Sequence, residues 1–265
     1  MPVENEFAAE SVAMPWDRLS LDDRFRFRCG RDLDCFTQCC RDVTIVLTPY
    51  DILRLKHSLK IGSEEFLEKY TLSPHFSNQT FPIVILKMNE ETKQCPFVCA
   101  KGCAVYSDRP WSCRMYPLGS AEPKNPSPEH KAFHFVVLEE LCHGHSEGPD
   151  WSVRDWISNQ GVEEFEVMGA SFKYLTLHDY WDKGPELTPA QAEMFYMACY
   201  DLDRFRRFVF ETRFLELLDV DEARIEAIRA HDEELLEFAI EWLRFALFRE
   251  PTMKVRRDTV VEAKA

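Results

Sequence analysis

The sequence lacks any long apolar segment. No stretch reaches the roughly 18 consecutive apolar residues that a helix needs to span a bilayer. The first twenty residues carry two early glutamates and have neither the positively charged start nor the continuous apolar run of a secretory signal. We therefore expect a cytoplasmic protein without membrane insertion.

Several common functional motifs are also missing. The sequence has no GxGxxG turn, no GxxxxGK[ST] loop, no HExxH and no GxSxG, so it gives no support to the usual nucleotide-binding and hydrolase functions. Positive charge is scarce, because 32 lysines and arginines face 46 acidic residues and the net charge is −14. Binding to nucleic acid normally uses a basic patch, so we expect no nucleic-acid partner.

Cysteine, in contrast, is abundant and unevenly placed. In a reducing compartment clustered thiols are more often ligands or catalysts than disulfides. Nine of the ten cysteines lie in the first 142 residues, and only Cys199 follows. The nine are Cys29, Cys35, Cys39, Cys40, Cys95, Cys99, Cys103, Cys113 and Cys142. Thiolates are the preferred ligands of zinc and of iron–sulfur clusters, usually four per centre.

The number of centres stays open at this point, because eight or nine thiols could serve one centre with spares or two centres. Adjacent side chains of an extended chain point in opposite directions. Cys39 and Cys40 are therefore expected either to serve two neighbouring centres or to leave one thiol free. Cys199 follows the apolar pattern of a predicted helix and is expected in the core. The imidazoles of His143 and His145, beside Cys142, offer further possible zinc ligands.

Basic residues gather beside the cysteines. Residues 24–41 and 93–114 each carry a net charge of +3, although the chain as a whole is strongly acidic. A centre with four thiolates is negative and needs cations and N–H donors nearby. The charge pattern therefore supports metal binding independently of the cysteine count.

The pattern of apolar residues predicts an α+β fold. It would comprise a small metal-stabilised cysteine-rich domain with few short strands, followed by a predominantly helical C-terminal half. The predicted divisions are a cysteine-cluster domain over 20–148, a helical region packed on it over 149–250, and flexible ends at 1–19 and 251–265.

Local signals place several elements within these divisions. Thr48, Pro49 and Asp51 are typical of a helix start, and the helix is expected to run to about Leu59. Thr188 and Gln191 form a second capping box with proline between them. Strands are predicted at 43–47, 81–88 and 132–138, and further helices from Ser63 and over 221–248.

The sequence resembles the YkgJ-type cysteine-cluster family in three segments and at Cys142. The segments are CGRDLDCFTQCC, LTPYDILRL and CPFVCAKGCAVYSDRPWSCRMYPLG. This family is also called the CxxCxxCC domain, a zinc- or iron-chelating domain. The most specific part is CxVYxxRPxxCRxYP, over residues 103–117. The resemblance covers roughly residues 25–145, and its first two cysteine spacings are longer than in the family pattern.

The resemblance implies a metal-ligand role for eight cysteines, with Arg109 and Arg114 as supporting residues and Cys99 as a possible further ligand. The eight are Cys29, Cys35, Cys39, Cys40, Cys95, Cys103, Cys113 and Cys142. The implied cofactor is an iron–sulfur cluster, of the 4Fe–4S type, or zinc.

Three functions compete. The first is an iron–sulfur protein for electron transfer or for part of a larger enzyme system, which would work with a protein partner. The second is a structural zinc-binding interaction module, in which metal binding supplies folding energy. The third is a metal-dependent protein-modifying enzyme, because some relatives of the family join such a domain to lysine methylation of flagellin. No acid–base pair or nucleophile is evident, so a metal-binding protein is favoured over a stand-alone enzyme.

Overall fold

The computed structural model describes residues 17–74 and 79–256. Most of the ends predicted to be flexible, at 1–19 and 251–265, therefore lies outside the described residues. The predicted α+β class is confirmed, because short strands form small sheets and the C-terminal half is helical. In the part of the chain that is described, no helix is long and apolar enough to cross a membrane.

Within residues 17–74 and 79–256, nine short strands pair into four small sheets, all antiparallel. The first sheet pairs β1 (Arg24–Arg26) with β9 (Asp150–Ser152), and the second has the order β2 (Val46–Leu47), β4 (Val84–Leu86), β3 (Thr71–Leu72). The third pairs β5 (Val98–Cys99) with β6 (Gly102–Cys103), and the fourth pairs β7 (Leu118–Ala121) with β8 (Phe133–Val136).

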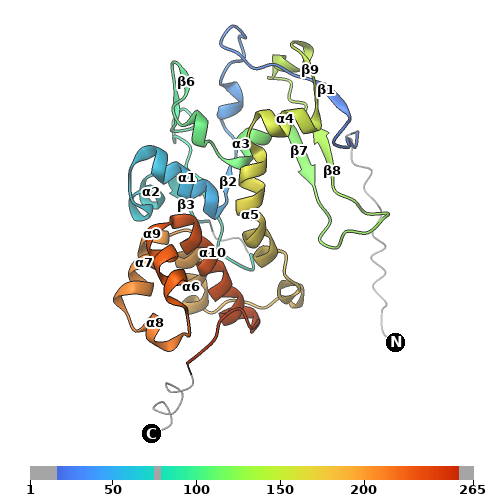
Figure 1. Ribbon diagram of the computed structural model, residues 1–265. Coiled ribbons are helices and arrows are strands. Elements are labelled where there is room, and N and C mark those ends of the chain that lie inside the picture. Colours follow the sequence, from blue (N-terminus) through green and yellow to red (C-terminus); the bar gives the residue numbers. More distant parts are fainter. Residues whose placement is uncertain (1–16, 75–78, 257–265) are drawn as a thin grey trace, which may run out of the picture.

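The helices divide into one set before residue 150 and another set after it. The first part holds α1 (Pro49–Leu59), α2 (Ser63–Tyr70), α3 (Trp111–Met115) and the 3₁₀ turns η1 (Gln38–Cys40), η2 (Tyr106–Asp108) and η3 (His143–Ser146). The second part holds α4 (Val153–Asn159), α5 (Val162–Thr176), η4 (Asp179–Lys183), α6 (Pro189–Cys199), α7 (Leu202–Glu211), α8 (Phe214–Leu217), α9 (Glu222–Ala230), α10 (Asp232–Leu243) and the π turn η5 (Arg244–Phe248). In Figure 1, α6 to α10 gather near the C-terminal end, and α5 extends from them toward α4 and the strands.

The two capping signals predict their helices correctly. Thr48 Oγ1 accepts a hydrogen bond from the Asp51 amide at 3.1 Å, and the Asp51 carboxylate accepts one from the Thr48 amide at 2.8 Å. This reciprocal pair satisfies amides that the first turn leaves free. Thr188 and Gln191 make the same arrangement at the start of α6. The predicted strands at 43–47 and 81–88 are present but shorter, as β2 and β4.

The apolar pattern over 221–248 was expected to be one helical stretch, and it is broken at His231. His231 adopts an extended conformation between α9 and α10. The guanidinium of Arg206, on α7, donates to the carbonyls of Ile228 and Arg229 at 2.8 and 2.7 Å. A remote side chain therefore satisfies the carbonyls that end α9, which helical periodicity alone does not indicate.

Two apolar cores hold the chain together. The larger combines α1, α2 and β4 with the C-terminal helices, and its fully buried side chains include Phe66, Phe195 and Phe205. The smaller lies among β1, α3, β7 and α4. There Trp156 meets Phe27 edge to face at 5.4 Å and donates its indole N–H to the Met115 carbonyl at 3.2 Å.

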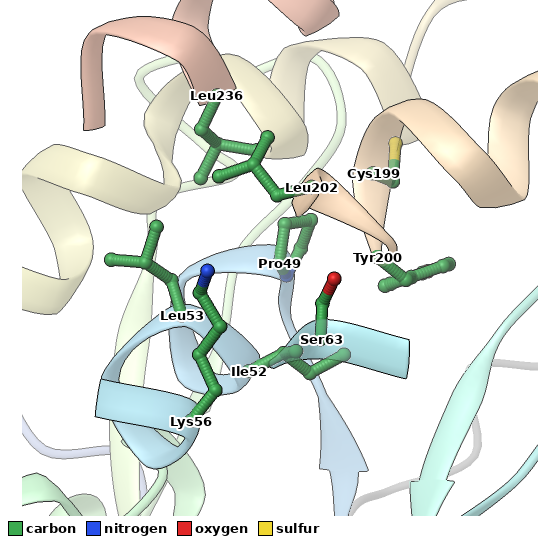
Figure 2. A pocket seen from close by; sticks show the side chains of 9 residues that line it. All are labelled: Pro49, Ile52, Leu53, Lys56, Ser63, Cys199, Tyr200, Leu202 and Leu236. Carbon is green, nitrogen blue, oxygen red and sulfur yellow. The ribbon is translucent and has the colours of Figure 1, made fainter. Parts of the chain in front are cut away.

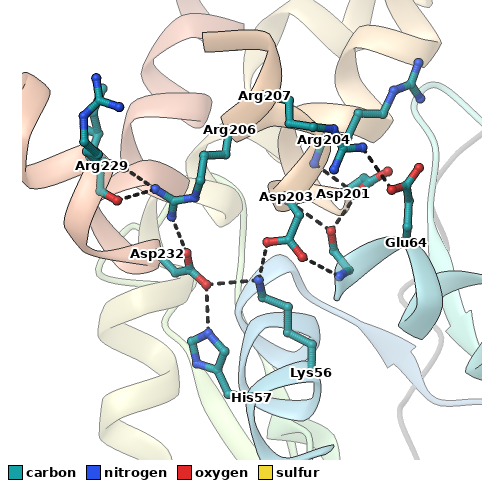
Figure 3. Close-up of polar contacts among 12 residues, drawn as sticks. Lys56, His57, Glu64, Asp201, Asp203, Arg204, Arg206, Arg207, Arg229 and Asp232 are labelled. Carbon is teal, nitrogen blue, oxygen red and sulfur yellow. Dashed lines mark hydrogen bonds and ion pairs between the residues drawn. The ribbon is translucent and has the colours of Figure 1, made fainter. Parts of the chain in front are cut away.

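A polar network joins α1 to the C-terminal helices (Figure 3). The Lys56 ammonium is buried and lies 2.7 Å from an Asp203 carboxylate oxygen and 3.0 Å from one of Asp232. Asp232 also pairs with Arg206 and, at 2.8 Å, with His57 Nε2. Buried charges are tolerated when they are paired in this way, so the network fixes α1 against α7 and α10.

The pocket in Figure 2 lies at this same junction. Its lining is mostly apolar, with the ammonium of Lys56 and the hydroxyl of Ser63 at one side. None of its nine lining residues is one of the cysteines from 29 to 142. We therefore interpret it as a gap between packed helices and place the candidate site elsewhere.

Candidate metal centre

The first group of thiols forms where the segment that follows β1 meets the segment that precedes η3. Cys29 follows β1, Cys35 lies in the turns that lead to η1, Cys39 lies within η1, and Cys142 immediately precedes η3. Burial and then the neighbouring thiols Cys39, Cys142 and Cys35 raise the pKa of Cys29 to about 11. The structure thus brings together four of the eight predicted ligands, although 113 positions separate the first from the last.

Close backbone contact holds the loop of Cys142 against that of Cys29. The Arg28 amide donates to the Gly144 carbonyl at 3.1 Å. A Cβ on Gly144 would lie 2.3 Å from the Arg28 carbonyl oxygen, a distance that backbone atoms cannot accommodate. Gly144, two residues after Cys142, is therefore needed for the approach of the two loops.

The second group contains Cys95, Cys103 and Cys113. Cys103 lies on the β5–β6 hairpin and Cys113 on the short helix α3. Burial and then neighbouring Cys95 raise the pKa of Cys113 to about 12, and burial likewise raises the pKa values of Cys95 and Cys103. Cys40 contacts this group through its backbone, because its carbonyl accepts from the Cys95 amide at 2.9 Å.

Cys39 and Cys40 connect the two groups, but not with the geometry expected. The expectation of oppositely directed side chains assumed an extended chain, whereas residues 38–40 form a 3₁₀ turn. Thr37 begins the turn at φ +69°. A hydrogen bond with the Cys40 thiol, followed by burial, raises the pKa of the Cys39 thiol. The two thiols therefore lie side by side at the junction of the groups.

Cys99 lies at the outer edge of the second group. It is exposed on the β5–β6 hairpin, and its thiol donates to the Gly102 carbonyl at 3.2 Å. Cys199 is 2% exposed and lies in the larger core. Burial raises the pKa of its thiol well above the usual value.

The spacing of the sulfur atoms distinguishes possible occupants. Four sulfurs bound to one zinc ion at about 2.3 Å in a tetrahedron lie about 3.8 Å apart. Within residues 17–74 and 79–256, no three cysteine sulfurs lie within 4.8 Å of one another. The one triplet of His, Cys, Asp or Glu donors that meets this limit there is Asp34, Cys35 and His143.

Two residues beside the cysteines have polar atoms without a partner. Both ring nitrogens of His145 are buried and unpaired, and so is the hydroxyl of Ser112, which precedes Cys113. Burial lowers the pKa of His145, so the ring is neutral, the form that binds metals. Buried polar groups are normally hydrogen-bonded, so these atoms and the surrounding thiols fit a polar or metallic occupant. The sequence indicated His145 only by its nearness to Cys142.

Arg109 supports the second group electrostatically. Its guanidinium donates to the Tyr106 carbonyl at 2.6 Å and to the Gln160 side chain at 2.5 Å. From this fixed position its charge opposes the rise in the pKa values of Cys103 and Cys113, although burial has the larger effect. The other predicted supporting residue, Arg114, instead donates to backbone carbonyls of residues 107, 109 and 160. It therefore holds loops together around α3.

Asp51 has a second role that the sequence did not reveal. Besides capping α1, its carboxylate accepts from the amide of Trp111 at 2.8 Å. Trp111 is the first residue of α3, so one buried acid fixes the starts of two helices, of which α3 carries Cys113. Sixty positions separate the two residues, and no local pattern links them.

Tyr116 connects the end of α3 to the first group. Its hydroxyl donates to a Glu139 carboxylate oxygen at 3.0 Å. Burial and then a hydrogen bond with the Cys142 thiol raise the pKa of Tyr116. The two groups of cysteines are therefore neighbours, joined at Cys39–Cys40 and through Tyr116.

The arrangement of thiols defines a class of protein domain, a metal-chelating domain built from clustered cysteines. Residues 28–143 match the model of the family described as "CxxCxxCC: Putative zinc- or iron-chelating domain". The resemblance noted in the sequence is thereby confirmed for this part of the chain, and the match supports metal binding by its cysteines. The match includes the eight predicted ligands and Cys99, and it leaves the C-terminal helices unassigned. No curated protein and no solved structure matches the chain.

Proposed function

We propose that the chain is an iron–sulfur protein with two adjacent centres. The first would be held by Cys29, Cys35, Cys39 and Cys142, and the second by Cys40, Cys95, Cys103 and Cys113. The proximity of the four thiols of the first group and that of Cys95, Cys103 and Cys113 support this division. Cys40 is assigned to the second centre because its carbonyl accepts from the Cys95 amide. The vicinal pair would then contribute one ligand to each centre.

The observation that carries the choice of iron–sulfur is the sulfur spacing. A single zinc ion needs sulfurs about 3.8 Å apart, and the described cysteines make no triplet within 4.8 Å. In a four-iron cluster each cysteine binds a different iron atom, so the ligating sulfurs lie further apart. The wider groups therefore favour a cluster over a mononuclear ion.

The proposed role is electron transfer, alone or within a larger enzyme system. Two centres joined by adjacent residues allow an electron to pass between them over a short path. Cys29 is exposed and would place the first centre near the surface, where a protein partner would exchange electrons with it. Nearby charge and N–H donors would tune the potential, and Arg109 is placed to do so for the second centre.

Elemental analysis of the protein purified without oxygen tests the proposal. We expect about eight irons and eight sulfides per chain, as two four-iron clusters require, with visible absorption that dithionite bleaches. Cys142→Ser and Cys103→Ser should each lose about half of the iron. Cys99→Ser, on an exposed cysteine of the same domain, serves as the matched control and should keep all of it.

Other metal contents would decide against this function. One or two zinc ions without iron would identify the domain as a structural zinc module. Stoichiometric amounts of neither metal would contradict metal binding by these cysteines and direct attention to thiol chemistry.

A further inference from the structure

An exposed triplet of potential metal ligands lies beside the first group of cysteines. The carboxylate of Asp34, the thiol of Cys35 and the imidazole of His143 place one donor atom each within 4.8 Å of the others. Asp34 and His143 are 79% and 53% exposed, and their side chains meet at 2.6 Å. Exposed ion pairs contribute little to stability, so folding alone gives no reason for this convergence.

The chemistry of the triplet suits a divalent transition-metal ion. Oxygen, nitrogen and sulfur donors together bind borderline ions such as zinc, cobalt and ferrous iron. Three protein ligands leave a coordination position open to solvent, as in exchangeable rather than closed structural sites. The His143 amide also donates to the Cys35 sulfur at 3.3 Å, which stabilises negative charge on that sulfur.

Cys35 belongs to both sets of ligands. It completes the exposed triplet, and it is one of the thiols that surround Cys29. A metal ion bound to Cys35 could therefore exchange its other ligands without being released. Of the other thiols in the first group, Cys39 and Cys142 are half buried, and Cys29 is exposed.

We propose that Asp34, Cys35 and His143 form a loading site, which captures a divalent metal ion from solvent and passes it to the other thiols of the first group. The ion first binds the Asp34 oxygen, the Cys35 sulfur and a His143 nitrogen. The proton of the Cys35 thiol passes to solvent in this step. The bonds to Asp34 and His143 then break while the ion binds a neighbouring thiol of the first group, and the proton of that thiol also passes to solvent. The ion keeps its charge, so no oxidant or reductant is needed. This inference rests on the proposed role of the first group as a metal centre.

Rapid mixing of metal-free, reduced protein with cobalt(II) under anaerobic conditions tests the proposal, because cobalt–thiolate absorption reports each added sulfur. The wild type should show a fast phase of weak absorption and a slower phase of strong absorption. The Asp34→Ala/His143→Ala double variant should lack the fast phase and load at least tenfold more slowly at substoichiometric cobalt. Its final cobalt content and spectrum should equal those of the wild type.

Matched controls are Asp22→Ala and His130→Ala, which remove an exposed acid and an exposed histidine away from the triplet. Both should load at the wild-type rate. A double variant that also loads at this rate would overturn the proposal. A double variant with less cobalt at the end point would overturn it too, because Asp34 and His143 would then be permanent ligands. A wild type that took up no cobalt would overturn the loading site, whereas the proposed function is decided separately by the iron and sulfide content of the protein purified without oxygen.

Discussion

The C-terminal helices and the cysteine loops are stabilised in different ways. Helices α6, α7 and α10 bury Phe195, Phe205 and Leu235 completely within one continuous core. The turn η1, which carries Cys39 and Cys40, has no buried residue, and most of the cysteines are only half buried. Apolar burial stabilises the helices directly, whereas ordered polar loops need additional bonds to offset their conformational entropy. We therefore expect metal ligation to stabilise mainly the cysteine loops.

Metal removal should separate the two parts most strongly. We expect a chelator to abolish protection from hydrogen exchange over residues 28–47 and 93–147, because the loops lose their coordination bonds. Protection in α6, α7 and α10 should persist. Hydrogen exchange followed by mass spectrometry measures both. Equal loss of protection in the two parts would contradict the division.

A core truncation should act on the helices alone. Phe205 is fully buried and lies 5.5 Å from the ring of Trp242. Phe205→Ala should lower the free energy of unfolding by about 3–5 kcal/mol and leave metal content unchanged. Val167→Ala, at a 72% exposed position, should change it by less than about 0.5 kcal/mol. Urea denaturation provides both values, and a Phe205→Ala protein as stable as the control would refute the argument.

Breaking the polar network between α1 and the C-terminal helices should lower the free energy of unfolding less than the core truncation does. Lys56→Met leaves the carboxylates of Asp203 and Asp232 without their shared cation. We expect a loss of roughly 3 kcal/mol in the free energy of unfolding, at the low end for a broken buried pair because Arg206 still pairs with Asp232. Lys124→Met, which breaks more exposed pairs, should lower the free energy of unfolding much less, because water screens exposed ion pairs. A Lys56→Met variant with an unchanged free energy of unfolding would mean that solvent already screens the charges of the network.

The same network predicts a pH dependence. Burial raises the pKa of Asp232, but Lys56, His57 and Arg206 outweigh it and lower the pKa from 3.8 to about 2. The unfolded chain therefore binds this proton more readily, and the stabilisation is present above pH 4 and lost as pH falls toward 2. The contribution is about 2 kcal/mol.

The difference in urea midpoint between the wild type and Asp232→Asn isolates this contribution, because acid release of metal affects both proteins alike. The difference should shrink between pH 5 and pH 3. A difference that stays constant with pH would show that Asp232 keeps an ordinary pKa.

The sequence predicts best those features that depend on neighbouring residues. The helix that starts after Thr48 and the one that starts after Thr188 were predicted from their own capping residues. The break at His231 was not, because Arg206 satisfies the α9 carbonyls from another helix. The turn at Cys39 and Cys40 escaped prediction for a similar reason, since Thr37 adopts a positive φ that its residue type does not indicate.

The features of the candidate site likewise divide into those that the sequence indicated and those that depend on tertiary packing. Spacing and family resemblance indicated the cysteines, and these gather in two groups. Which cysteines meet could not be read from the sequence, because loops far apart in the chain form each group. The second contact of Asp51 and the unpaired nitrogens of His145 likewise depend on tertiary packing.

Helix α1 has a consequence for regulation. Its first turn holds α3 through Asp51, and its last turn pairs with the C-terminal helices through Lys56. Helix α1 therefore contacts both α3, which carries Cys113, and the C-terminal helices. Through α1, the packing of these helices is linked to the metal affinity of the cysteines. A partner protein that bound the C-terminal helices and shifted α1 would change the affinity of the cysteines for metal. By thermodynamic reciprocity, loading the metal would change the affinity for that partner by the same factor.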